Sequence, residues 1–143
     1  MFVGAYYHTI EEKGRVSVPK SFRSELAHGS VVTHGLDGCL FIFTADSWQK
    51  LVDKLQSLPL TSKASRDFLR LLTYNATPLD LDKLGRTRIP ESLSNLVGLS
   101  KEVVFAGALT RVEIWDKKKY HAYVESLEGQ EGELESALGE LGI

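Results

Sequence analysis

Apolar and polar residues alternate in two matching short segments, RVSV at 15–18 and RTRI at 86–89. A period of two residues is typical of a strand with one buried face, so the arginines of both segments should point away from the core. Another candidate strand, 6–10, precedes the first segment. Gly14 lies between them, where a tight turn would need a positive φ angle. We expect 6–10 and 15–18 to form a hairpin.

The residues after each alternating segment predict the same further elements twice. Pro19 and Pro90 end the strands and suit the first turn of a short helix. Two apolar segments around a turn then predict a second hairpin, at 31–44 in one copy and at 102–115 in the other. We expect an α+β fold with a mainly β core.

A closing helix is expected in each copy, over 48–58 and over 117–127. Asp46 and Asp116 precede these segments, and an aspartate side chain can accept hydrogen bonds from the free N–H groups of a first helical turn. We therefore predict both aspartates as N-terminal caps.

An internal repeat accounts for this duplication. IEEKGRVSVP at 10–19 aligns with LDKLGRTRIP at 81–90 at an offset of 71, and the later elements align at an offset of 72. A period of this length points to two copies of one supersecondary unit. The sequence thus predicts four units: repeat 1 over 1–59, a linking helix over 60–78, repeat 2 over 79–127 and an acidic, flexible tail over 128–143.

The linker and the tail differ in composition. Phe68, Leu69, Leu72 and Ala76 follow helical spacing, which favours a linking helix over a flexible tether. The tail is acidic, rich in glycine and poor in aromatic residues, and such a segment rarely buries enough apolar surface to become ordered.

Charge is distributed unevenly although the net charge is only −2. Six of the 19 acidic residues lie from Glu125 onward, where there is no Lys or Arg. Residues 1–124 thus hold 13 acidic and 17 basic residues and a formal charge of +4. This balance is compatible with a basic, nucleic-acid-binding face, and equally with a solvated surface of mixed sign.

An acid-x-x-x-Arg spacing occurs at the same place in both repeats, as Glu11 to Arg15 and as Asp82 to Arg86. Around a tight turn each carboxylate could hold its arginine in a fixed pose, and an oriented arginine is a good ligand for phosphate or guanine. The alternative interpretation is an exposed ion pair that closes the turn and contributes little to the stability of the fold. Further candidate DNA-binding cations near these turns are Lys13, Lys20, Arg23, Lys83 and Arg88.

Patterns typical of catalysis or metal binding are not found. The four histidines lack ligand spacing, Cys39 is the single cysteine, and no phosphate-binding loop or nucleophile motif occurs. We expect no enzyme activity, no metal or other cofactor and no small-molecule substrate. No segment is long and apolar enough to span a membrane, and residues 1–4 do not resemble a secretion signal, so we expect a cytoplasmic protein without membrane contact.

Four motifs carry a family resemblance: Met1-Phe2-x-Gly4-Ala5, Lys13-Gly14-Arg15-x-Ser17-Val18-Pro19, Asp82-x-x-Gly85-Arg86 and Glu113-x-Trp115-Asp116. Together they resemble the MraZ family of transcriptional regulators, which is built from two SpoVT-AbrB-type repeats. The resemblance covers almost the whole chain. It implies a swapped-hairpin, AbrB-like β-barrel with attached helices, assembled into a ring-shaped homo-oligomer.

The resemblance also implies roles for particular residues. Arg15 and Arg86 would contact double-stranded DNA, held by Glu11 and Asp82. An arginine on the helix after the proline would add a contact, and this position is Arg23 in repeat 1. Repeat 2 has Ser94 there, so the repeats should contribute unequally. Family members typically have Asp at the first acidic position, where Glu11 adds a methylene group.

The function implied by the resemblance is a nucleoid-associated repressor of its own promoter, upstream of the division and cell-wall gene cluster, that binds short direct repeats. Two alternatives remain. One is a ring-forming assembly or scaffold protein whose arginine pairs join subunits. The other is an AbrB-type antitoxin that binds a toxin as well as DNA, although the duplication and the closing helices fit it less well.

Overall fold

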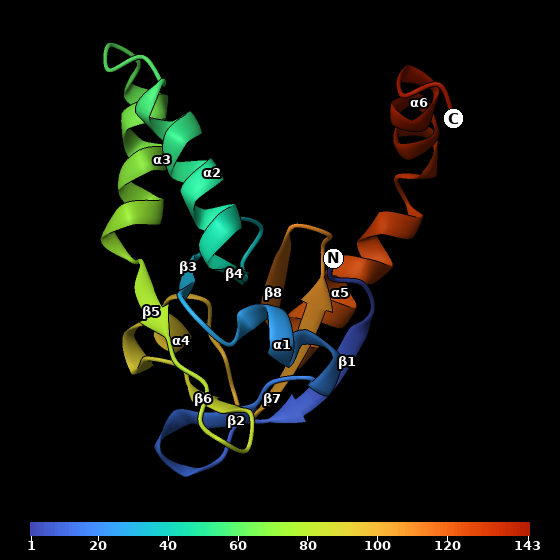
Figure 1. The fold of residues 1–143 in the computed structure, drawn as a ribbon. Coiled ribbons are helices and arrows are strands. Elements are labelled where there is room, and N and C mark those ends of the chain that lie inside the picture. Colours follow the sequence, from blue (N-terminus) through green and yellow to red (C-terminus); the bar gives the residue numbers. More distant parts are fainter.

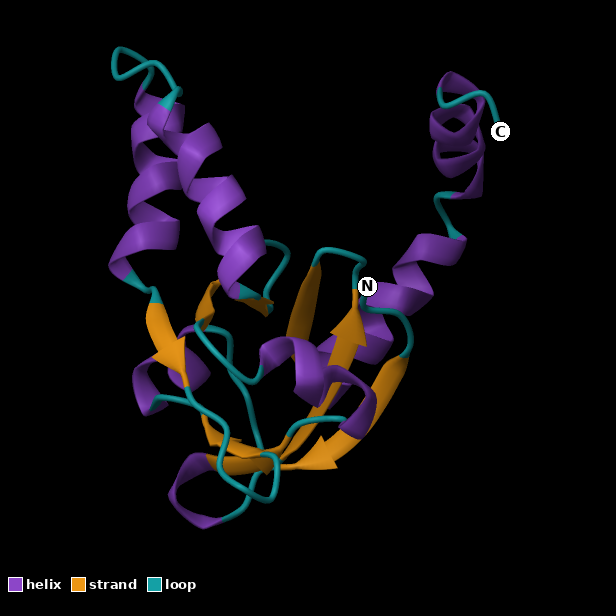
Figure 2. Cartoon of the chain, viewed as in Figure 1, coloured by secondary structure: helices purple, strands orange, loops and turns teal.

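The computed structural model describes residues 1–143 and shows an α+β fold in which antiparallel strands form the centre and helices flank them (Figures 1 and 2). The strands are β1 Ala5–Thr9, β2 Arg15–Ser17, β3 Ser30–His34, β4 Leu40–Phe43, β5 Thr77–Leu79, β6 Arg86–Arg88, β7 Glu102–Gly107 and β8 Arg111–Asp116. The helices are η1 Glu12–Gly14, η2 Lys20–Phe22, α1 Arg23–Leu26, α2 Ala45–Gln56, α3 Lys63–Tyr74, α4 Glu91–Leu96, α5 Lys117–Glu128 and α6 Glu131–Glu140.

The strand order reveals an internal two-fold relationship. Six strands form one sheet in the order β1-β7-β8-β4-β3-β5, and β2 pairs with β6 in a separate two-stranded ribbon. The counterparts in the two repeats are β1 and β5, β2 and β6, β3 and β7, and β4 and β8. When each strand is exchanged for its counterpart, the same order of the six-stranded sheet is read from the other end, and the ribbon is unchanged. The two repeats are therefore related by a pseudo-two-fold arrangement.

The strands exchange partners between the repeats, and the predicted hairpin of 6–10 with 15–18 is wrong. β1 pairs with β7, and β2 pairs with β6, so both strands of the expected hairpin find their partners in the other repeat. Only the turn between them is closed locally, by a hydrogen bond of 2.7 Å from the backbone N–H of Glu11 to the carbonyl oxygen of Arg15. Periodicity specifies which face of a strand is buried, whereas long-range packing selects its partner.

Both repeats contribute to one hydrophobic core. Its 16 buried residues include Val18 and Ile42 from the first repeat and Ile89 and Ile114 from the second. A smaller cluster on the other face of the sheet contains Cys39, whose thiol has a pKa raised mainly by burial. Because the core and the sheet are shared, each repeat completes the other.

The helix caps confirm one prediction and correct another. The Asp116 carboxylate accepts a hydrogen bond from the N–H of Lys119 and caps α5 as expected. The cap of α2 is Thr44, whose hydroxyl oxygen accepts from the N–H of Ser47, so the prediction of Asp46 is wrong. Asp46 lies inside the first turn of the helix, while Thr44 is the equivalent of Asp116 at an offset of 72.

The segment 60–78 contains helix α3, which is joined to α2 by a short loop (Figure 1). Its last residues differ from the expected linker, since residues 77–79 form β5 and pair with β3.

The tail also differs from the expectation of a flexible segment. Residues 131–140 form α6, which projects away from the sheet with every residue exposed (Figure 1). Its Glu, Ala and Leu residues have high helix propensity. None of the helices has both the length and the apolar character needed to cross a membrane.

Asp116→Ala tests the contribution of this cap. The carboxylate also accepts from the backbone N–H and the hydroxyl of Ser100, so we expect the free energy of unfolding to fall by about 1–3 kcal/mol at pH 7. Burial raises the pKa of Asp116, but its hydrogen bonds outweigh burial and the net shift is downward. The charged form is favoured on folding, so this stability is lost as the pH falls through the lowered pKa. Urea denaturation of the wild type and of Asp116→Ala at pH 7 and at pH 3 should show a smaller difference in the free energy of unfolding at pH 3. A difference independent of pH would contradict this account.

Candidate nucleic-acid interface

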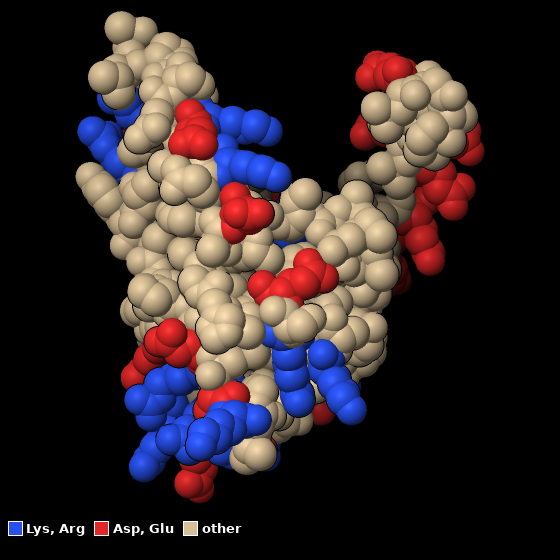
Figure 3. All heavy atoms as spheres, viewed as in Figure 1, with Lys and Arg blue, Asp and Glu red and all other residues tan.

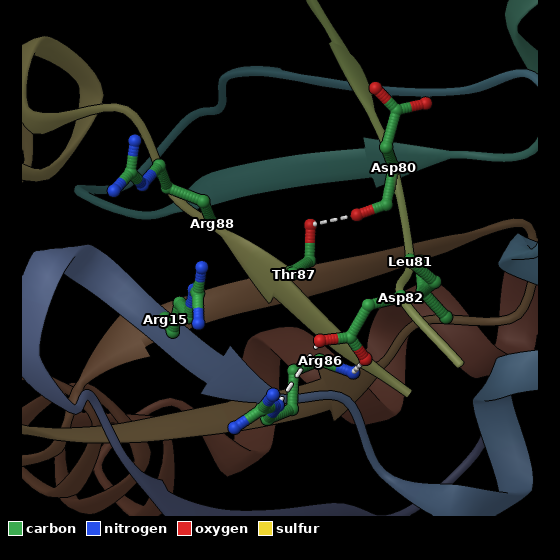
Figure 4. Close-up of a pocket in the computed structure, with 7 residues that line it drawn as sticks. All are labelled: Arg15, Asp80, Leu81, Asp82, Arg86, Thr87 and Arg88. Carbon is green, nitrogen blue, oxygen red and sulfur yellow. Dashed lines mark hydrogen bonds and ion pairs between the residues drawn. The ribbon is translucent and has the colours of Figure 1, made fainter. Parts of the chain in front are cut away.

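The β2–β6 ribbon positions three arginines on one outer surface. In the antiparallel register Arg15 lies opposite Arg88, and Ser17 lies opposite Arg86. The alternate positions, Val16 and Thr87, are buried in the core. Period-two alternation therefore turns the arginines outward, as predicted, and Figure 4 shows all three beside one another on the two strands.

Like charges directly opposite each other destabilise a pair of strands. The facing Arg15 and Arg88 have no negative charge paired with them to offset their repulsion. No carboxylate forms an ion pair with either Arg15 or Arg88, and Arg15 makes no side-chain hydrogen bond at all. The Arg88 Nε donates instead to the carbonyl oxygen of Lys13, 2.8 Å away in the other repeat. Two arginines held together without counter-charge form a surface that favours an anionic partner.

A shallow polar depression of about 520 Å³ lies over these side chains (Figure 4). Its lining residues are Arg15, Asp80, Leu81, Asp82, Arg86, Thr87 and Arg88, of which only Leu81 is apolar. At its floor the Thr87 hydroxyl donates a hydrogen bond of 2.8 Å to the carbonyl oxygen of Asp80. An open, cationic depression without an apolar floor suits a phosphate backbone better than a small organic molecule.

Asp82 holds Arg86, as the spacing predicts. Its Oδ2 accepts from the Arg86 Nε at 3.1 Å, and its Oδ1 accepts from the backbone N–H groups of Leu84 and Arg86, both at 2.9 Å. The backbone N–H of Arg86 is the main cause of a lowered pKa for Asp82, to which the N–H of Leu84 and the guanidinium also contribute against desolvation. The carboxylate thus stays ionised and orients its arginine.

The corresponding pair in the first repeat is not formed. Glu11 accepts no side-chain hydrogen bond and makes no ion pair with Arg15. Asp82 is short enough to reach back to the N–H groups of its own turn, whereas the additional methylene of Glu11 places the carboxylate beyond that position. Arg15 is consequently less constrained than Arg86.

Arg23 crosses from its own repeat onto the turn of the other. Its Nε donates to the carbonyl oxygen of Val18 at 2.8 Å, and its side chain occupies the space beside Gly85. A Cβ atom at Gly85 would collide with that Nε. The backbone of Gly85 also has a φ angle of +77°, so glycine is required there for two reasons. The sequence signal was the glycine of each Gly-Arg pair, but nothing local indicated its contact with Arg23.

The equivalent position in the second repeat is open. Ser94 stands where Arg23 stands in the first repeat, and a depression of about 430 Å³ lies between Ser94 and Gly14. Glu91 also lines this depression and reduces its positive charge. The two halves of the surface therefore differ in shape and in charge.

The three predicted lysines lie at unequal places. Lys13 lines the depression beside Ser94, and Lys83 lines another one with Arg23 and His28. Lys20 is exposed on η2 and lines none of these three depressions, so the structure does not join it to the arginine surface. Figure 3 shows blue basic atoms gathered at the end of the molecule where β2 and β6 lie, with a few carboxylates among them.

No group of three or more His, Cys, Asp or Glu side chains is arranged to hold a metal ion. The candidate chemistry of the surface is therefore charge recognition and hydrogen bonding by guanidinium groups.

Gly85→Ala tests the contact with Arg23. Gly38 has a φ angle of +92°, and no atom lies within 4 Å of the place that a Cβ would take, so Gly38→Ala is a matched control for backbone strain alone. We expect Gly38→Ala to lower the free energy of unfolding by about 1–2 kcal/mol. Gly85→Ala should cost about 1–3 kcal/mol more, because Arg23 must leave its place. Chemical denaturation measures both, and the additional cost should shrink when Arg23→Ala is introduced in the same chain. Equal costs for the two glycine variants would contradict the contact.

Comparison with known proteins agrees with the duplicated architecture. The family model described as "MraZ protein, putative antitoxin-like" matches twice, over residues 1–71 and 72–137. The chain is 44% identical over 143 residues to the transcriptional regulator MraZ of Halothermothrix orenii and 43% identical over 143 residues to that of Alkaliphilus metalliredigens, with full coverage of each protein. It is 45% identical over 126 residues to the MraZ of Clostridium beijerinckii, covering 88% of this chain and 89% of that protein. This family is not one of enzymes. With two family repeats and full-length relatives, the chain belongs to the MraZ family of transcriptional regulators.

Proposed function

We propose that the β2–β6 ribbon is the surface through which this regulator binds double-stranded DNA, with Arg15, Arg86 and Arg88 as its central contacts. The observation that carries the proposal is the facing pair of arginines on β2 and β6, which has no carboxylate to neutralise it. Repulsion between the facing arginines destabilises the folded protein, and a bound anion would neutralise that repulsion.

The geometry of a ribbon suits this partner. A two-stranded β-ribbon fits the major groove of B-DNA, where an arginine can donate two hydrogen bonds to guanine O6 and N7. Arg86, oriented by Asp82, is the best candidate for such a base contact. Lys13, Lys83 and Arg23 line depressions beside the ribbon, and we assign them to phosphate contacts. A phosphate contact by Lys20 stays a prediction from the sequence.

The regulatory role follows from this surface together with the family. We propose that the protein represses its own promoter, upstream of the division and cell-wall gene cluster, by binding short direct repeats as a ring-shaped oligomer. Several modest faces on successive DNA repeats gain affinity by multivalency. A nucleoid-associated location follows from the same proposal.

The competing proposal is a ring-forming scaffold in which the arginines join subunits. The two are separated by charge reversal. If the arginines bind DNA, Arg15→Glu with Arg86→Glu should abolish DNA binding and leave the oligomer intact. If they join subunits, the same change should dissociate the oligomer, as measured by light scattering after size-exclusion chromatography.

Single alanine variants of the ribbon arginines test the DNA contacts directly. A mobility-shift titration with DNA from upstream of the protein's own gene, alongside scrambled DNA, should show a loss of about 1–3 kcal/mol of binding free energy for Arg15→Ala or Arg86→Ala. Lys118→Ala, which changes an exposed lysine on α5, serves as a control and should leave binding nearly unchanged. Binding should also weaken steeply with salt. Wild-type affinity in both arginine variants would refute the proposal.

The unequal turns predict unequal effects of their carboxylates. Asp82→Ala should weaken sequence-specific binding several-fold more than Glu11→Ala, because only Asp82 orients its arginine. Asp82→Asn should recover part of the loss, since the amide oxygen can still accept from the turn N–H groups. The readout is the ratio of affinities for specific and scrambled DNA. Equal losses from the two alanine variants would show that the orientation of Arg86 is unimportant.

A further inference from the structure

A partly apolar groove lies at the base of the helical hairpin formed by α2 and α3, away from the arginine ribbon. It has a volume of about 330 Å³ and is lined by Phe41, Phe43, Ser47, Lys50, Leu51, Lys54, Phe68, Leu72, Thr110 and Arg111. Half of these residues are hydrophobic. Nothing in the proposed DNA contact uses this groove.

The rim of the groove is basic. Lys50 and Lys54 are one helical turn apart on α2, both exposed, and their ammonium groups form no hydrogen bond or ion pair. Arg111 stands on the opposite rim, with its guanidinium 4.5 Å from the centre of the Phe41 ring and paired to Glu113. An apolar floor beside two unpaired lysines suits an amphipathic helix with acidic flanks.

The chain itself carries a helix of this kind. In α6, Leu134 and Leu138 are one turn apart and remain about 45% exposed, and Leu141 follows at the same face with 74% of its surface exposed. Its glutamates, Glu131, Glu133, Glu135 and Glu140, make no ion pair. The four carboxylates of α6 are thus opposite in charge to the lysines of the groove, and its leucines are apolar like the floor of the groove.

The arrangement of the elements favours contact between copies. Helix α5 follows β8 and rests on β7 and β8, from which α6 projects away from the body. Figure 1 shows α6 and the α2–α3 hairpin on opposite sides of the molecule, and Figure 3 shows the acidic helix and the basic hairpin separated by open space. A projecting helix of one copy that enters a groove elsewhere on the next copy forms a head-to-tail contact, which closes into a ring when successive rotations add to a full turn.

We propose that α6 of one copy binds in the α2–α3 groove of the next copy, with the leucines on Phe41 and Phe43 and the glutamates beside Lys50 and Lys54. The inference rests on the oligomer in the proposed function and names the contact that builds it. This contact leaves the arginine ribbon of each copy free for DNA.

A charge exchange tests the contact without DNA. In one variant Lys50 and Lys54 are both changed to Glu, and in the other Glu131 and Glu135, also one turn apart, are both changed to Lys. We expect each variant alone to lose the oligomer and to run close to the 15.9 kDa of one chain in light scattering after size-exclusion chromatography. An equimolar mixture should regain the large species, because each tail then meets a groove of opposite charge. Lys101→Glu with Lys118→Glu makes the same change in charge elsewhere and should keep the wild-type mass.

The outcomes separate the possibilities. A wild-type mass for the Lys50/Lys54 variant, or no recovery in the mixture, would overturn the proposal; an α6 that folds back into the groove of its own chain predicts such a lack of recovery. A wild-type chain that is monomeric would overturn it too. Failure of the DNA proposal is distinct, because it would appear as a charge-sensitive oligomer that does not prefer operator DNA to scrambled DNA.

Discussion

The pairing of β2 with β6 is the interaction on which the arginine surface depends. Each strand has three residues, and an isolated two-stranded ribbon of that length would be marginal in water. The ribbon persists because its inner side chains, Val16 and Thr87, are buried in a core that both repeats share. A surface made from one strand of each repeat can exist only when both repeats are folded together, which links the duplication of the sequence to the site.

The pseudo-two-fold scaffold carries two turns that are chemically unequal. Asp82 binds its own turn and Arg86, whereas Glu11 leaves Arg15 unrestrained. Arg23 covers the turn at Gly85, while Ser94 leaves the turn at Gly14 open. A symmetric site would suit a palindrome. Unequal halves give the surface a direction, which is consistent with the direct repeats of the proposed operator, because each copy can then bind in the same orientation.

Charge is separated along the molecule in a way that keeps its two proposed contacts apart. The arginine ribbon lies at one end, and the α2–α3 hairpin and α6 extend from the other (Figures 1 and 3). The acidic α6 carries most of the excess negative charge, and so the modest net charge of −2 conceals a basic body. Assembly through the helices would array the ribbons on DNA without covering them.

Much of the local structure and of the site could be predicted from the sequence. The offset between IEEKGRVSVP and LDKLGRTRIP revealed the repeats, the period of two in RVSV and RTRI placed the arginines outside, and the spacing of Asp82 from Arg86 anticipated their ion pair. These features depend on residues within a few positions of one another, for which backbone geometry alone determines the relative placement. The same is true of the cap at Asp116.

Only the tertiary structure decided which strands pair, that Arg23 lies against Gly85, and that Arg15 faces Arg88 without a counter-charge. It also decided that Glu11 does not repeat the role of Asp82, a difference of one methylene that spacing does not register. Periodicity encodes which face of an element is buried, but it does not encode the partner. The partner is selected by burial and hydrogen bonding summed over residues about 70 positions apart, as for Arg15 and Arg88.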